Sequence, residues 1–103
     1  MALPTLTPEQ RADALAKAAA ARARRAQVKV DLKSGSMRLS ELLEAADSDE
    51  VMAKMKVLAL LQALPRVGAT TARAVLEEVG ISESRRVRGL GAHQRAELVR
   101  RFG

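Results

Sequence analysis

A short stretch at residues 64–68, Leu-Pro-Arg-Val-Gly, has the residue types of a phosphate-binding turn. Pro65 cannot continue a helix and Gly68 allows backbone torsions that other residues resist, so a tight turn is predicted before a helix that starts near Ala69. The first turn of that helix presents unpaired N–H groups at the positive end of its dipole, and nearby hydroxyls and guanidiniums add donors. An ordinary helical hairpin is the alternative. The candidate contacts are Pro65, Arg66, Val67, Gly68, Thr70, Thr71 and Arg73.

A second basic segment, at residues 82–91, places three arginines within four positions, beside two glycines and two serines. Guanidinium groups match phosphate oxygens bidentately, and glycine lets a backbone approach a ligand closely. We therefore expect a second phosphate contact here, with a solvated charge run as the alternative. Its candidate residues are Ser82, Ser84, Arg85, Arg86, Arg88 and Gly89.

Other kinds of binding site are poorly represented in the chain. Phe102 is the only aromatic residue, so the stacking platforms of single-strand binders are missing and a duplex is the better partner. No helix carries a set of Asn and Gln side chains for reading bases, so backbone contacts and DNA shape should dominate. His93 is the only histidine and there is no cysteine, so we expect no catalytic residue, no metal and no cofactor.

Length and composition set the frame for these sites. A chain of 103 residues corresponds to one small core, and its richness in Ala, Leu, Arg and Glu predicts an all-α fold. The net charge of +6 predicts a field that attracts polyanions. With no cysteine, no long apolar run and no signal-peptide pattern, we expect a cytoplasmic protein with no membrane contact and no small-molecule substrate.

A long N-terminal helix should carry one of the two basic regions. Thr7, Pro8 and Gln10 form a helix start with a capping box, and the helix should run to about Leu32, before Gly35. Only its C-terminal part has enough apolar side chain to dock, so the N-terminal turns should project. A purely solvated helix is the alternative to a second DNA contact. The candidate contacts are Arg11, Lys17, Arg22, Arg24 and Arg25.

The rest of the chain predicts about four to five short helices packed as a compact bundle. Apolar spacing indicates a short helix capped by Ser40, a central helix over residues 49–64, a helix from Ala69 to a C-cap at Gly80, and a last helix over residues 92–102. One further helical turn, capped by Ser82, is predicted at residues 82–86. We therefore divide the chain into an N-terminal helical extension, residues 1–35, and a body, residues 36–103.

Four parts of the sequence resemble the actinobacterial integration host factor family: residues 64–68, residues 80–91, the Lys-Met-Lys-Val at residues 54–57 and the Leu-Thr-Pro-Glu-Gln-Arg at residues 6–11. The resemblance covers essentially the whole chain and is most specific in residues 80–91. It implies a long N-terminal helix followed by a helix-two-turns-helix body, similar to that of a small-subunit ribosomal protein. It also implies a nucleoid-associated protein, monomeric in solution, that binds duplex DNA with little sequence selectivity, bends or compacts it, and needs no cofactor.

One residue departs from the family pattern. Arg66 stands where the usual Pro-Gly-Val-Gly turn has glycine. If the turn requires a positive φ there, arginine costs about 1 kcal/mol, while its side chain could add a phosphate contact.

Two other functions compete with a DNA-binding role. A helix-two-turns-helix body also occurs in a ribosomal protein, and phosphate contacts alone do not identify the sugar, so an RNA- or ribosome-associated protein is the main alternative. In the second alternative function, the first helix docks onto a protein partner or an acidic membrane surface.

Overall fold

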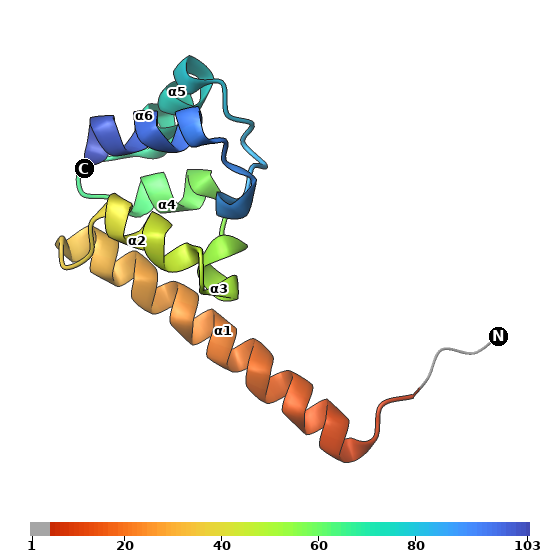
Figure 1. The fold of residues 1–103 in the computed structure, drawn as a ribbon. Helices are drawn as coiled ribbons and strands as arrows, with labels where there is room; N and C mark the ends of the chain where they lie inside the picture. The colour runs from red at the N-terminus through yellow and green to blue at the C-terminus, as the bar shows by residue number, and fades with distance from the viewer. Residues whose placement is uncertain (1–4) are drawn as a thin grey trace.

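The structure, a computed structural model, describes residues 5–103, and all the secondary-structure elements named in that range are helices. A long helix runs diagonally below a compact body of short helices (Figure 1). The all-α prediction is therefore confirmed. The elements in chain order are α1 (Pro8–Ser34), α2 (Leu39–Ala46), α3 (Glu50–Ala53), α4 (Val57–Ala63), α5 (Ala69–Val79), a 3₁₀ turn η1 (Val87–Gly89) and α6 (Ala92–Phe102).

The predicted ends of α1 are confirmed. The Thr7 hydroxyl accepts a hydrogen bond from the Gln10 N–H at 3.1 Å, and the Gln10 side chain accepts one from the Thr7 N–H at 2.9 Å. Gly35 ends the helix with a φ of 82°, a torsion that glycine adopts without strain. At 1.5 Å per residue, its 27 residues extend about 40 Å.

Only the C-terminal turns of α1 pack against the body. Every residue from 8 to 20 is exposed, including Leu15, whereas Val28 and Leu32 are buried in the hydrophobic core, where α1 packs against α3 and α4. The projecting half gives the chain a radius of gyration of 16.1 Å, above the roughly 13 Å expected for a compact domain of this length. Val28 and Leu32 of α1 belong to the same hydrophobic core as the body. The division of the chain into an extension and a body at residue 35 therefore stays a prediction.

The prediction of a single central helix over residues 49–64 is wrong. This segment is divided into α3 and α4 by a break at residues 54–56, where Lys56 pairs with Arg86 in an isolated antiparallel β-bridge. The Val57 N–H donates to the Arg85 carbonyl at 3.0 Å, and the Val87 N–H donates to the Met55 carbonyl at 2.9 Å. These long-range bonds replace the helical ones, so a tertiary contact overrides the apolar periodicity.

Two smaller predictions also need correction. The N-cap of α2 is Arg38 rather than Ser40, and the Arg38 N–H donates to the Glu41 carboxylate at 3.0 Å. The helical turn predicted at residues 82–86 is absent, and the chain makes a non-helical turn there. The Ser82 hydroxyl accepts a hydrogen bond from the Ser84 N–H at 3.2 Å, and this local bond competes with helix formation.

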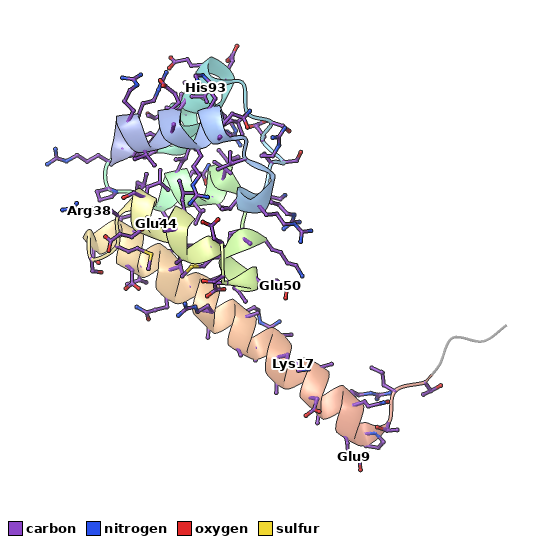
Figure 2. All side chains as sticks on the ribbon, viewed as in Figure 1. Glu9, Lys17, Arg38, Glu44, Glu50 and His93 are labelled. Atoms are coloured by element: carbon purple, nitrogen blue, oxygen red, sulfur yellow. The ribbon has the colours of Figure 1, made fainter. Side chains whose placement is uncertain are left out.

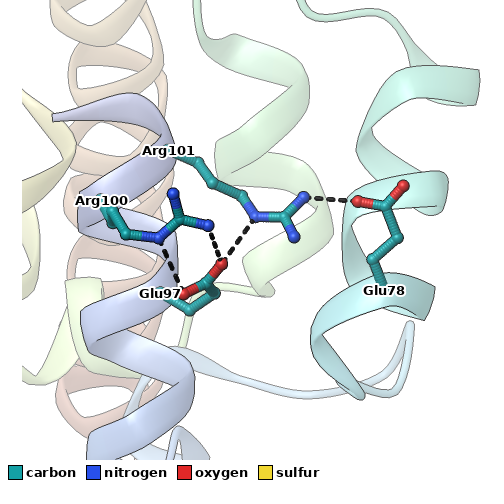
Figure 3. A network of polar contacts seen from close by, with 4 residues as sticks. All are labelled: Glu78, Glu97, Arg100 and Arg101. Atoms are coloured by element: carbon teal, nitrogen blue, oxygen red, sulfur yellow. Dashed lines mark hydrogen bonds and ion pairs between the residues drawn. The ribbon is translucent and has the colours of Figure 1, made fainter.

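The predicted last helix is confirmed as α6, which an ionic network ties to α5 (Figure 3). The Glu97 carboxylate accepts hydrogen bonds from Arg100 and Arg101, and Arg101 also donates to Glu78 of α5 at 2.5 Å. The guanidiniums of Arg100 and then Arg101 lower the pKa of Glu97 to about 2. The network therefore stays ionised well below neutral pH.

Candidate nucleic-acid interface

The hairpin between α4 and α5 has the predicted tight turn, with an unexpected distribution of torsions. The Val67 N–H closes the turn on the Leu64 carbonyl at 3.3 Å, and α5 begins at Ala69. Gly68 has a φ of −91°, which any residue can adopt, so the prediction that Gly68 needs a torsion reserved for glycine is wrong. Arg66 carries the positive φ instead, at 64°, the position that the resemblance marked as glycine. The turn therefore keeps the glycine-like geometry with an arginine in it.

The hairpin presents polar groups to solvent at the start of α5. Gly68 has no side chain to cap the helix, so the N–H groups of the first turn stay available for an external acceptor. Pro65, Arg66, Thr70 and Thr71 are exposed, and Val67 is half-buried against the core. This arrangement suits an anion at the α5 N-terminus.

The three arginines of the second basic segment have different surroundings. The Arg85 guanidinium donates to the Gly89 carbonyl at 2.7 Å, and Arg86 donates to the Lys54 carbonyl at 2.5 Å. Arg88 is exposed on η1. The pKa of Glu50 is lowered mainly by its hydrogen bond from Lys54, and the charge of Arg88 adds to this effect. The packing thus uses Arg85 and Arg86 to hold the segment, and leaves Arg88 most free for a ligand.

The hairpin and the second basic segment lie at opposite ends of α4. The hairpin follows the last residue of α4. At the other end, the N–H of Val57, the first residue of α4, donates a hydrogen bond to the Arg85 carbonyl of the second basic segment. The seven residues of α4 separate the two by about 10 Å. This distance lies between the widths of the DNA minor and major grooves, about 6 and 12 Å.

Two predicted contact residues are engaged in ion pairs across the fold. Arg73 of α5 pairs with Glu83 at 2.7 Å, and Arg24 of α1 pairs with Asp49 at 2.9 Å. The pKa of Asp49 is lowered, first by the hydrogen bond from the Met52 N–H and then by Arg24. A phosphate would have to compete with these carboxylates for either arginine.

The remaining basic residues of α1 lie on its exposed surface. Lys17 is exposed on the N-terminal half of α1 (Figure 2), where it lines a hollow together with Glu50 and Lys54. Arg11, Arg22 and Arg25 are likewise exposed. The structure therefore keeps a second basic region on a separate element from the hairpin, as the sequence predicts.

Sequence reasoning did not select four lysines that the fold brings beside these predicted contacts: Lys29, Lys33, Lys54 and Lys56. Lys29 and Lys33 follow Arg25 at intervals of four, which places all three on one face of α1. That spacing could have identified them. Lys54 and Lys56 could not be placed, because the break between α3 and α4 was not predicted.

Comparison with known proteins places this geometry in a family. Residues 32–102 match the S13-like H2TH domain family. The integration host factor of Streptomyces coelicolor is 57% identical over all 103 residues, which cover 96% of its own length. The chain belongs to the integration host factor family. That of Mycobacterium tuberculosis is 55% identical over 103 residues and 98% of its length.

A solved structure shows the same family fold beside a nucleic acid. The structure of sIHF bound to an 8-base-pair palindromic DNA matches this chain with a TM-score of 0.82 and 53% sequence identity, over 84% of this chain and 98% of that one. The resemblance to the integration host factor family and its helix-two-turns-helix body is therefore confirmed. Within residues 5–103, no helix is both long and apolar enough to cross a membrane.

Proposed function

We propose that this chain binds duplex DNA with low sequence specificity and bends or compacts it in the nucleoid, within the cytoplasm. The observation that carries the proposal is the match to the DNA-bound sIHF structure over most of the chain. The excess of positive charge and the open α5 N-terminus are what such binding requires. The protein acts as a monomer that binds rather than catalyses.

The duplex meets the body at both ends of α4. Arg66 and the first turn of α5 contact phosphates at one end, and Arg88 contacts them at the other. Because about 10 Å separates these ends, the phosphates on the two sides of one groove can engage them together. The projecting half of α1, with Arg11, Lys17 and Arg22, makes an additional contact.

A salt-titrated competition assay tests this function. Labelled duplex DNA is competed with unlabelled duplex, single-stranded DNA and folded RNA of matched length. We expect duplex to compete best, with a log-log salt slope of about −4 to −7 for roughly five to eight phosphate contacts. A flat salt response contradicts the proposal, and preference for folded RNA favours the ribosome-associated alternative. End-labelled duplex followed by energy transfer should report shortening on binding, and an unchanged end-to-end distance contradicts bending.

A further inference from the structure

A continuous trough runs along α1 where its C-terminal half faces α3 and α4. Three hollows of about 360, 310 and 480 Å³ adjoin one another, because the first two share Arg25 and Lys54 and the last two share Lys29 and Ala59. From Lys17 to Lys33 the trough follows about 24 Å of helix. We call it the α1 trough, and its cations are Lys17, Arg25, Lys29, Lys33, Lys54, Lys56 and Arg86.

These seven cations come from three separate parts of the chain and face one acid. Glu50 is the only carboxylate among the described residues that line the trough, and it pairs with Lys54 at 2.9 Å. Elsewhere on the surface, arginines face carboxylates, as Arg95 does Asp47 at 3.0 Å. Bringing like charges together in one hollow is unfavourable unless an anion occupies it. A solvated charge run on one helix would not converge in this way.

The floor of the trough suits a phosphate backbone better than bases. Ala21, Val51 and Ala59 line it, so small apolar side chains let a strand lie close to the cations above them. Gln62 is the only side-chain amide among the lining residues that the structure describes. With one amide and no aromatic ring, the trough offers charge and shape without base reading.

The break between α3 and α4 builds the middle of the trough. The β-bridge between Lys56 and Arg86 holds the two segments together, and the Arg86 hydrogen bond to the Lys54 carbonyl fixes the lysine-bearing loop. At the far end, the Lys33 ammonium lies 3.4 Å from the Leu64 carbonyl, beside the hairpin. The trough therefore joins the projecting half of α1 to one end of α4.

We propose that the α1 trough binds one phosphate strand of the duplex, with Lys29 and Lys56 as its central contacts. A strand of B-DNA carries one charge per 3.4 Å of axis, so 24 Å corresponds to about seven phosphates, similar to the number of cations. The proposal rests on the proposed DNA-binding function and specifies where the strand lies. It extends the interface beyond the hairpin and the second basic segment.

A matched pair of variants tests the proposal by affinity. The trough variant, Lys29→Gln with Lys56→Gln, removes two exposed cations with no ion-pair partner among residues 5–103. The control variant, Arg38→Gln with Arg100→Gln, removes two exposed cations outside the trough, so both variants lower the net charge equally. Arg100 pairs with Glu97, but Arg101 keeps its own hydrogen bonds to Glu97 and Glu78 in this control. We expect the trough variant to bind duplex roughly tenfold more weakly and to reduce the magnitude of the salt slope by about 1.8.

The outcomes separate this proposal from the function on which it rests. If the wild-type chain binds duplex but the two variants lose affinity equally, only net charge matters and the trough proposal is wrong. If the wild-type chain fails to bind duplex, the proposed function itself fails. Circular dichroism should show unchanged helicity in both variants.

A thiol in the trough gives a second readout that does not depend on affinity. The chain has no cysteine, so Ala59→Cys introduces a single reactive thiol on the floor of the trough. Ala96→Cys places one on the exposed surface of α6 as the control. Saturating duplex should slow alkylation of the Ala59→Cys thiol by iodoacetamide several-fold and leave that of the Ala96→Cys thiol unchanged. Equal alkylation rates with and without duplex at both positions would overturn the proposal.

Discussion

Arg66 combines an unfavourable backbone torsion with an exposed, charged side chain. It is the only non-glycine residue with a positive φ in the described chain, and that conformation costs an L-residue about 1 kcal/mol. The side chain is exposed at the tip of the hairpin, and within residues 5–103 no ion pair offsets this cost. We infer that its charge serves the DNA contact rather than the fold.

Replacing Arg66 should therefore change stability and DNA affinity in opposite directions. Arg66→Gly relieves the torsion, so the free energy of unfolding should rise by about 1 kcal/mol, while duplex affinity falls several-fold with the lost phosphate contact. Arg66→Ala keeps the torsional cost and loses the charge, so it should lower affinity alone. Urea denaturation and duplex titration measure the two quantities. Unchanged affinity in both variants would assign Arg66 no part in binding.

At the scale of elements, the second basic segment combines a structural role with a binding role. The β-bridge and the Arg86 hydrogen bond to the Lys54 carbonyl attach the segment to the break between α3 and α4. Arg88, three residues before Gly91 at the start of α6, points to solvent without such a bond in the described chain. The arginines that look equivalent in sequence are therefore separable in the structure.

Single substitutions should separate these roles. Arg86→Ala leaves the Lys54 carbonyl without its donor, so we expect the free energy of unfolding to fall by about 1 kcal/mol together with duplex affinity. Arg88→Ala should lower affinity by a similar factor for all sequences and leave thermal unfolding unchanged. Thermal melts followed by circular dichroism and duplex titrations at one salt concentration make the comparison. A matching loss of stability in Arg88→Ala would mean that this arginine is structural.

At the scale of the whole molecule, the projecting half of α1 contributes nothing to the core. Side chains from residue 8 to residue 20 are all exposed, and the first buried residue of the helix is Val28. Helical propensity and the Thr7 cap keep this part helical, since packing does not. This part carries Arg11 and Lys17, and a helix held away from the body is positioned to lengthen the DNA contact through them.

Deleting residues 1–15 should therefore reduce DNA binding without destabilising the body. The deletion removes Arg11 and no buried side chain of the described chain. We expect an unfolding free energy within about 0.5 kcal/mol of the full chain and a salt slope smaller in magnitude by about 0.9. Urea denaturation and salt-titrated binding check both. A large loss of stability would show that the first turns support the fold.

Much of this protein is determined by local sequence. Thr7, Pro8 and Gln10 set the start of α1, while Gly35 and Gly80 end α1 and α5 through torsions that glycine adopts freely. Apolar spacing of three and four residues marks α5 and α6 because a helix repeats every 3.6 residues. The hairpin at residues 64–68 and the family resemblance follow from short segments, so they are also visible in the sequence.

Tertiary structure alone decided the features that depend on contacts distant in sequence. The break between α3 and α4 exists because Met55 and Val57 exchange backbone hydrogen bonds with Val87 and Arg85, about 30 residues later, which no local periodicity encodes. That break brings Lys54 and Lys56 opposite α1 and so creates the α1 trough. The pairing of Arg24 with Asp49 and of Arg73 with Glu83 was equally hidden, since charges pair by distance in space.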